Sequence, residues 1–182
     1  MKYLLTLFLV SFLSFSAHAD EMADSKILQV GFGTYVIVVG YDDAYYEEDI
    51  LTGITFSIRG SLSDNFALHG NFYSTDHEDF SAIENTGTDI IAYFGTGLQS
   101  KGFKAYAGGG IFNETWELSG YEVDFSGIQF SGGVGHNWDN VAIDFMLSIR
   151  DPSDYEDFIY DSLGGSVTAA AVSGSMQLSA RF

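Results

Sequence analysis

Histidine is the first residue type to examine for chemistry, because acyl hydrolysis needs a nucleophile within reach of an oriented base. If residues 1–19 are removed as a signal peptide, three histidines remain, His69, His77 and His136. We expect His77 in an acidic loop and His136 in a short turn, where neither lies beside a serine on an apolar surface. The sequence therefore predicts no catalytic residue.

His69 is expected to serve a structural purpose inside the fold. If Ser63-Asp64-Asn65 forms a three-residue hairpin turn, Leu62 pairs with Phe66 and Arg59 pairs with His69. A positive neighbour disfavours the imidazolium, so His69 should remain a neutral hydrogen-bonding residue. Buried charges need partners, and we expect a polar network inside the fold. Its predicted members are Arg59, His69, Asp144, Arg150 and Arg181.

Acidic residues dominate the chain, whose formal net charge is -18. Nineteen of the twenty-five Asp and Glu residues lie in or beside four connecting segments that contain no Lys or Arg. One interpretation is simple solvation. The other is weak binding of Ca²⁺ or Mg²⁺, although the spacing does not match an EF-hand. The carboxylates considered for this metal site are Asp42, Asp43, Glu47, Glu48, Asp49, Asp154, Glu156, Asp157 and Asp161. Nucleic acid is not an expected partner at this charge, and no cofactor is expected.

The elements that must position these residues are strands, because apolar and polar residues alternate with a period of two. The clearest segment is 172–182, and the same pattern recurs in three others. Less regular segments bring the count to eight. The sixth changes phase near Ser126-Gly127, which predicts a β-bulge. The segments in chain order are 28–38, 54–62, 66–73, 89–99, 103–112, 123–134, 141–149 and 172–182.

The connections alternate between long and short along the chain, as in an up-and-down barrel whose long loops share one rim. Aromatic residues stand near both rims, where two interfacial girdles would need them. The long connections are 41–53, 74–88, 113–122 and 151–165, and the short ones are 63–65, 100–102 and 136–140. The expected girdles are Phe66, Phe103, Trp138 and Phe182 at the short-turn rim, and Tyr41, Tyr73, Phe112, Trp116 and Tyr121 at the other.

The first nineteen residues have the pattern of a secretory signal peptide. Lys2 precedes an apolar run from Leu4 to Leu13, and Ala17-His18-Ala19 predicts cleavage before Asp20. Residues 20–182 then form one domain without cysteine. Alternation alone does not say which face points outward, so a soluble lipocalin-like barrel is the alternative. The polar set is rich in Gly, Ser, Tyr and charged residues, which favours a polar interior and a lipid-facing exterior.

Three stretches resemble the outer-membrane β-barrel domain superfamily, which includes the small OmpA-like and OmpX-like barrels of Gram-negative bacteria. They are the signal peptide, the strand-turn-strand segment from Phe56 to Phe72, and the terminal Met176-Gln-Leu-Ser-Ala-Arg-Phe182. The resemblance covers the whole mature chain and is specific for architecture. It implies location in the outer membrane, contact with lipid and lipopolysaccharide, and recognition of Phe182 by the barrel-assembly machinery.

The sequence thus predicts an all-β protein, an eight-stranded antiparallel up-and-down transmembrane β-barrel after a cleaved N-terminal signal peptide. Eight strands enclose an interior that side chains largely fill, so a wide pore is disfavoured. We expect a structural or surface-interaction protein that is not an enzyme, with an unidentified ligand at its acidic loops. The alternatives are a lipid A-modifying enzyme of the deacylase or acyltransferase type and a narrow channel.

Overall fold

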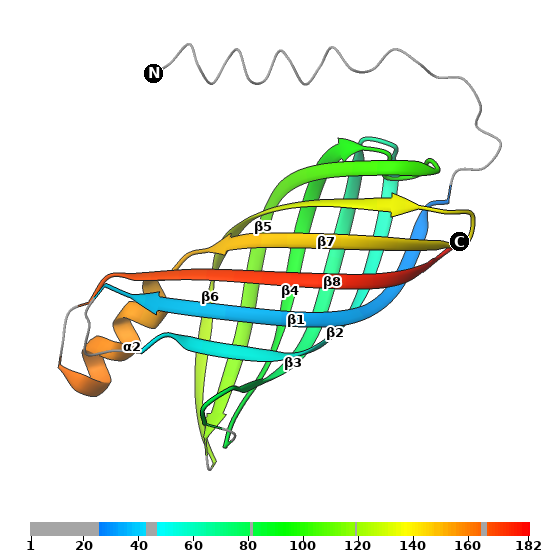
Figure 1. Cartoon of the computed structure of the whole chain (residues 1–182). Helices are drawn as coiled ribbons and strands as arrows, with labels where there is room; N and C mark the ends of the chain where they lie inside the picture. The colour runs from blue at the N-terminus through cyan, green and yellow to red at the C-terminus, as the bar shows by residue number, and fades with distance from the viewer. Residues whose placement is uncertain (1–25, 43–46, 81, 119, 165–166) are drawn as a thin grey trace, which may run out of the picture.

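Eight antiparallel strands form a closed barrel in which each strand pairs with its neighbours in the chain and β8 pairs with β1 (Figure 1). The computed structural model describes residues 26–42, 47–80, 82–118, 120–164 and 167–182. The predicted signal peptide lies outside the described residues. The strands are β1 (Leu28–Tyr41), β2 (Asp49–Ser63), β3 (Phe66–His77), β4 (Ile83–Thr96), β5 (Gly102–Leu118), β6 (Tyr121–Asn137), β7 (Val141–Arg150) and β8 (Ala169–Arg181). The predicted eight-stranded fold is confirmed.

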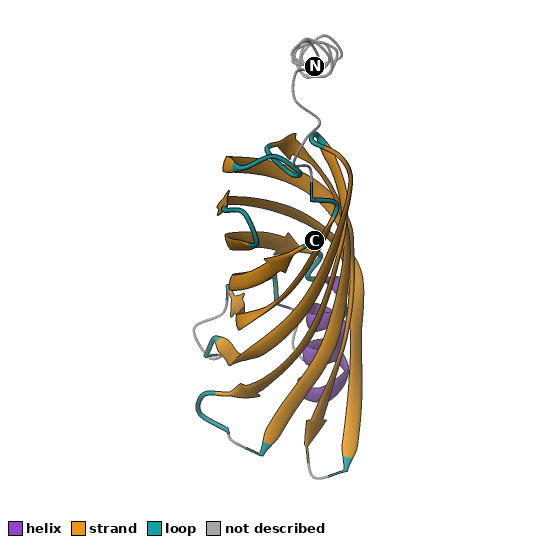
Figure 2. Cartoon of the chain, turned by 90° about the vertical axis from the view of Figure 1, so that its right-hand side faces the viewer, coloured by secondary structure: helices purple, strands orange, loops and turns teal. Residues whose placement is uncertain are grey.

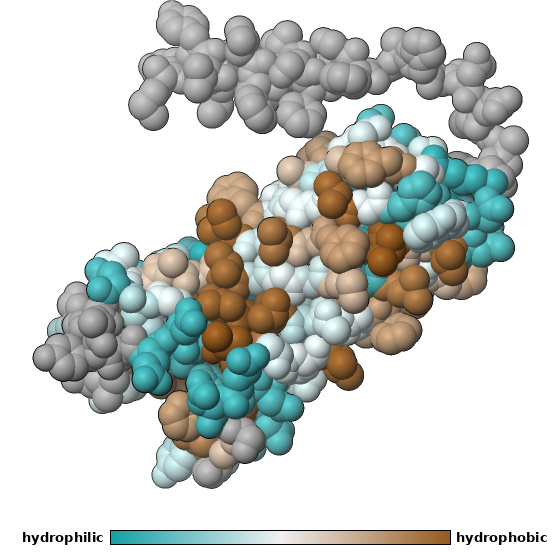
Figure 3. Space-filling view, viewed as in Figure 1, coloured by the Kyte–Doolittle hydropathy of each residue, from teal (hydrophilic) through white to brown (hydrophobic). Residues whose placement is uncertain are grey.

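The barrel is apolar outside and polar inside, which decides between the two orientations that alternation left open. Large hydrophobic side chains project from the outer wall on every strand, and Leu147 is 74% exposed. Charged side chains project inward, and Arg59, Asp144 and Arg150 are each 1 or 2% exposed. Figure 3 shows hydrophobic side chains spread over the wall between more hydrophilic ends. A soluble barrel would have the opposite arrangement, because water disfavours a continuous apolar exterior.

Tight turns and the described chain ends share one rim of the barrel. Leu28 and Phe182 exchange backbone hydrogen bonds there, at 3.2 and 2.8 Å. The same rim carries the three short connections between β2 and β3, β4 and β5, and β6 and β7. We call it the turn rim. The opposite rim, which carries the other four connections, is called the loop rim.

The first three connections at the loop rim are shorter than predicted, because the strands continue beyond their apolar segments, whereas the fourth extends to residue 168. The third connection shrinks from the predicted 113–122 to a turn between Leu118 and Tyr121. The fourth contains α2 (Ser153–Leu163), the one helix among the described residues. In Figures 1 and 2 this helix lies at the end of the barrel opposite the C-terminus. No helix in the described segments has the length and hydropathy needed to cross a bilayer.

The predicted bulge in β6 is wrong. Pairing with β5 runs without a register shift from Tyr121 to Asn137. The change of phase in the sequence has another cause. Phe125 is apolar and points inward, where it stacks on Tyr155 of α2 with ring centroids 4.6 Å apart. At the loop rim the interior itself is apolar, so the apolar residues change sides while the strand does not.

The predicted register of the first hairpin is correct at Arg59 and His69 but wrong nearer the turn. Ser63, rather than Leu62, pairs with Phe66, and the register shifts between Ser61 and Ser63. Leu62 is therefore the extra residue of a bulge, and its side chain is 70% exposed on the outer wall.

Two glycines of the Gly108-Gly109-Gly110 run on β5 allow neighbouring strands to approach closely. A Cβ added to Gly108 would lie 1.9 Å from the carbonyl oxygen of Ala92, and one added to Gly110 would lie 2.0 Å from that of Ile90. These two positions exclude any side chain. Gly109, which faces outward, meets its nearest atom at 3.5 Å and is not constrained in this way.

Candidate functional site

The half of the interior nearer the turn rim contains a charged cluster centred on Asp144. Its Oδ1 accepts hydrogen bonds from Arg59 Nη1 at 3.0 Å and from the Tyr106 hydroxyl at 2.6 Å. Its Oδ2 accepts one from Lys104 Nζ at 2.7 Å. All four side chains are buried. One carboxylate thus compensates two buried cations, and Gln29 supplies a further acceptor for Lys104 at 3.2 Å.

A second cluster, nearer the loop rim, is centred on Arg150. Its Nη1 donates to Glu114 at 2.7 Å, and its Nη2 contacts Asp89 at 3.1 Å. Nη2 also donates to the hydroxyls of Tyr35 at 2.8 Å and Tyr73 at 3.1 Å. Those two tyrosine rings stack with centroids 4.2 Å apart. Here one guanidinium joins two carboxylates, the reverse of the Asp144 cluster.

The remaining two members of the predicted polar network also lie inside the barrel. His69 contacts Asn71 Oδ1 through Nε2 at 3.1 Å, which suits a neutral ring that donates from this nitrogen. Arg181 donates to the backbone carbonyl oxygens of Gln99, at 2.6 Å, and of Trp138. The five residues do not form a single network. Asp144 and Arg59 belong to one cluster and Arg150 to the other. Arg181 instead bonds backbone carbonyl groups near two of the short turns.

Lys104 and Glu114 are interior residues that the predicted polar network did not include. Glu114 was expected in the acidic connection 113–122, but both side chains are fully buried in the interior. Their phase on β5 is the signal that could have placed them. Lys104 and Glu114 are both even-numbered, like the inward-facing Tyr106 and Phe112, and strand residues two apart share a face.

The β4–β5 turn closes the turn rim from within. The side chain of Leu98 is fully buried, and its carbonyl oxygen accepts a hydrogen bond from the Ser61 hydroxyl at 3.1 Å. Asp64 of the neighbouring turn accepts backbone N–H groups of Gly97, Gln99 and Ser100 at 2.8 to 3.1 Å. Burial raises the pKa of Asp64, but these hydrogen bonds outweigh it and hold the pKa below its usual value.

At the loop rim α2 closes the interior. Tyr155 stacks on Phe125 and donates to Glu114 Oε1 at 2.8 Å. Its ring is 1% exposed, and burial raises the pKa of the Tyr155 hydroxyl.

Three of the long-loop aromatics predicted as a girdle, Tyr73, Phe112 and Trp116, are buried in this inner apolar cluster. That part of the girdle prediction is wrong, because the interior is apolar at this level and the three rings pack inside it. Tyr121, in contrast, is 80% exposed. Two predicted residues of the turn-rim girdle are exposed as well, Phe103 at 66% and Phe182 at 62%.

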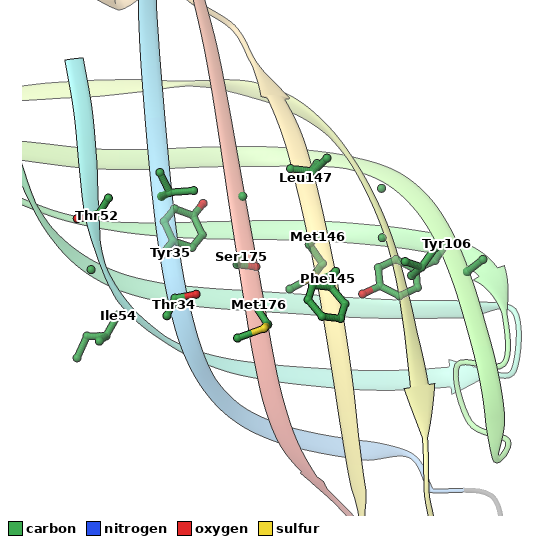
Figure 4. Close-up of a pocket in the computed structure, with 17 residues that line it drawn as sticks. Thr34, Tyr35, Thr52, Ile54, Tyr106, Phe145, Met146, Leu147, Ser175 and Met176 are labelled. Atoms are coloured by element: carbon green, nitrogen blue, oxygen red, sulfur yellow. The ribbon is translucent and has the colours of Figure 1, made fainter. Parts of the chain in front are cut away.

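Little free volume remains between the two charged clusters. A cavity of about 10 Å³, bordered by Tyr35, Asn71, Asp89 and Tyr93, has room for about one water molecule. Another hollow, of about 1120 Å³, is lined by outward-facing side chains such as Ile54, Phe145 and Met176 and also by the inward-facing Tyr35, Tyr106 and Met146 (Figure 4).

Half of the described carboxylates considered for a cation site already accept hydrogen bonds from the protein. Asp42 accepts the Thr168 N–H at 2.8 Å, Asp154 the Ser126 N–H at 2.7 Å, and Glu156 the Ala169 N–H at 2.7 Å. The Asp42 contact joins the first and fourth connections, which are neighbours because β8 pairs with β1. Asp49 accepts from Tyr41 at 2.6 Å and contacts His77 at 3.1 Å.

The other members of that set are dispersed. The side chains of Glu47, Glu48, Asp157 and Asp161 are exposed, and Asp43 lies outside the described residues. No group of three or more His, Asp or Glu side chains within the described ranges could hold a metal ion. Likewise, none of the three described histidines forms a hydrogen bond with the hydroxyl group of a described serine or threonine. His77 Nδ1 instead accepts the backbone N–H groups of Asp79 and Phe80, at 3.1 and 3.2 Å.

A closed eight-stranded barrel with an apolar wall and a filled polar interior has the architecture of the small outer-membrane β-barrels. No family model matches the sequence, and no curated protein matches it either. Solved structures do match the fold, and they confirm the resemblance to small outer-membrane barrels at that level.

Three of these structures illustrate the similarity. Ail, the attachment invasion locus protein of Yersinia pestis, has a TM-score of 0.57 at 15% identity, over 87% of this chain and 99% of that one. The outer membrane protein OprG of Pseudomonas aeruginosa has a TM-score of 0.55 at 12% identity, over 90% and 99%. Neisserial surface protein A has a TM-score of 0.55 at 12% identity, over 85% and 97%.

Proposed function

We propose that this protein is an integral outer-membrane β-barrel, exported through a signal peptide at residues 1–19, with a structural or surface-interaction role. The observation that carries the proposal is the inverted polarity of the barrel. Its wall is apolar, while Arg59, Lys104, Asp144 and Arg150 are paired inside. Lipid stabilises such a wall, and a closed barrel leaves no backbone group unpaired in the membrane.

The interior supports a structural role over catalysis or wide-pore transport. Both rims are closed from within, by Leu98 at one and by Tyr155 at the other. This leaves the outer surface of the loop rim as the part available to partners, and loops on a rigid scaffold commonly carry recognition. Ail has been solved in complex with the heparin analogue sucrose octasulfate. A polyanion is not the partner we propose here, since the loop rim is acidic.

The proposal is tested by cell fractionation and by gel mobility. The protein should be recovered with outer membranes, and unheated samples should migrate faster than boiled ones because the closed barrel resists detergent until heated. A variant lacking residues 1–19 should stay in the cytoplasm. Recovery of the wild type in the soluble periplasmic fraction would contradict the proposal.

Phe182 is proposed as the signal read by the barrel-assembly machinery. Its ring is 62% exposed on the outer wall, while its backbone closes the barrel by pairing with Leu28. Deletion of Phe182 should lower the amount of heat-modifiable barrel and leave export unchanged. Phe182→Tyr is the matched control, because it keeps an aromatic ring and should assemble normally. Normal assembly of the deletion would leave Phe182 as an interfacial residue only.

A further inference from the structure

His77, the last residue of β3, is buried at the loop rim, and both of its ring nitrogens have partners. Nε2 lies 3.1 Å from Asp49 Oδ1 on β2. Nδ1 accepts the backbone N–H groups of Asp79 and Phe80, at 3.1 and 3.2 Å. These two N–H groups belong to the connection between β3 and β4. The ring therefore ties the start of that connection to the end of its own strand.

These contacts define the protonation state of the ring. A nitrogen that accepts two N–H groups carries no proton of its own, so the single proton of the neutral imidazole lies on Nε2. From there it points at the carboxylate of Asp49. Asp49 in turn accepts the hydroxyl proton of Tyr41 on β1, at 2.6 Å. Both nitrogens of His77 are thus satisfied in the neutral Nε2–H form and in no other form.

A second proton would affect the two sides of the ring differently. An imidazolium donates from both nitrogens. Nε2 would keep its contact with Asp49, which then becomes an ion pair. Nδ1–H, in contrast, would face two other N–H donors, those of Asp79 and Phe80. The conflict falls on the connection, because its two N–H groups lose their acceptor while the ring stays attached to β2.

The neighbouring backbone contact does not depend on the ring. Glu78 N–H donates to the carbonyl oxygen of Ile50 at 2.9 Å and so continues the contacts between β2 and β3. No titratable group takes part in this hydrogen bond. The charge of His77 therefore acts on two successive N–H groups and leaves the one before them paired.

The charged groups around the ring are acidic. Asp49 faces it from β2, and Tyr41 reaches Asp49 from β1. Phe80 packs on the ring with centroids 5.2 Å apart and brings no charge. The cations of the described chain are buried inside the barrel or lie at the turn rim. Asp49 is thus positioned to compensate an imidazolium. The other titratable groups of β3, of the connection and of β4 at this level have exposed side chains, and they are Asp76, Glu78, Asp79 and Glu84.

We propose that His77 is a pH-sensitive latch of the loop rim, which holds residues 79–80 while its ring is neutral and releases them when the ring takes up a proton. The latch is complete on the alkaline side and is lost as the pH falls. Histidine is the side chain that changes charge between pH 5 and 8. The loop rim therefore presents a different surface in acid, including the ring of Phe80, which is 61% exposed. This inference rests on the proposed function, since a loop rim outside the cell meets the pH of the medium directly.

The test follows single backbone amides of the detergent-folded full-length barrel by hydrogen exchange, from about pH 8 to about pH 5. Rates are corrected for the intrinsic pH dependence of exchange. Protection at Asp79 and Phe80 should fall about fivefold or more in acid, because each amide loses its acceptor. Glu78 is the internal control and should keep its protection. The ¹⁵N chemical shifts of the His77 ring should report the Nε2–H form at the alkaline end.

Two variants separate the latch from its charge. The side-chain oxygen of Asn accepts the backbone N–H two residues on, and it does not titrate. His77→Asn should therefore keep Asp79 protected at both ends of the pH range. His77→Leu has no acceptor and should leave Asp79 and Phe80 unprotected throughout. His136→Asn, near the turn rim, is the matched control and should behave as the wild type.

Protection at Asp79 and Phe80 that does not change with pH would overturn the proposal. The same acid loss in His77→Asn would also overturn it, because the titration would then belong to the neighbouring carboxylates, as would a parallel loss at Glu78, which would mean that the end of β3 frays. The wild-type comparison needs no variant, so misfolding of a variant does not affect it. Heat-modifiable migration is recorded on the same samples. A folded barrel whose amides ignore pH refutes this inference alone, whereas a wild type without heat modifiability counts against the proposed function.

Discussion

Asp144 is the residue on which two buried cations depend. Its carboxylate contacts Arg59 at 3.0 Å and Lys104 at 2.7 Å, and all three side chains are at most 3% exposed. Removing one partner of a buried ion pair leaves an uncompensated charge, which typically costs about 3–5 kcal/mol.

We therefore expect Asp144→Ala to lower the free energy of unfolding by about that amount. The measurement is urea unfolding of the barrel in lipid vesicles. Glu47→Ala, at an exposed carboxylate, should change it by less than about 0.5 kcal/mol. Asp144→Ala/Lys104→Met should regain part of the loss, because the second change removes one of the unpaired cations. Equal stability of Asp144→Ala and Glu47→Ala would show that the cluster does not stabilise the fold.

Asp64 gives the turn rim a defined dependence on pH. Folding lowers the pKa of its carboxyl through backbone N–H groups of Ser100, Gln99 and Gly97. The stabilisation is therefore complete above the unfolded value of about 4 and is lost as the pH falls through the folded-state pKa. Amide exchange in the β4–β5 turn, corrected for its intrinsic pH dependence, should show less protection in acid. Asp64→Asn should remove this pH dependence, whereas Asp157→Asn on α2 should retain it.

At the scale of elements, α2 completes the barrel without belonging to its wall. It buries the ring of Tyr155 against Phe125 and Phe112, and its carboxylates bond backbone groups on β6 and β8. A locally packed element of this kind can open without unfolding the rest of the protein.

Tyr155→Ala should release α2 selectively. The truncation removes a buried aromatic ring, a change worth about 3 kcal/mol or more, so amide exchange across residues 155–162 should accelerate strongly while β7 and β8 keep their protection. Tyr160→Ala is the control, since that ring is 61% exposed. Tyr155→Phe, which loses only the hydrogen bond to Glu114, should have an intermediate effect. Faster exchange throughout the barrel would mean that α2 and the wall unfold together.

For the whole molecule, the important feature is a barrel closed at both ends. Leu98 fills one end, Tyr155 fills the other, and about one water fits between the two charged clusters. In planar lipid bilayers we expect the wild type to produce no stepwise single-channel current. Shortening the inner plug in Leu98→Ala/Tyr155→Ala should give measurable leakage, whereas shortening the outward-facing Leu147 to Ala should not. Discrete openings of the wild type would support the narrow-channel alternative.

The sequence alone determined the strand count, the antiparallel order and the pairing of Arg59 with His69, because alternation and turn spacing are local properties of the chain. It also identified Asp144 and Arg150 as interior charges, since both lie in a strand of regular phase. It left Lys104 out of the interior network and put Glu114 in an acidic connection, because the alternation in their segment is less regular.

Only the tertiary structure decided which face of the barrel is outside and which charges meet. Arg59 and Asp144 are 85 residues apart, and no local pattern specifies a contact across a closed barrel. The phase change in β6 misled for the same reason. Phe125 is apolar on the inner face because α2 packs there, and alternation records the polarity of a residue's surroundings rather than the direction of its side chain.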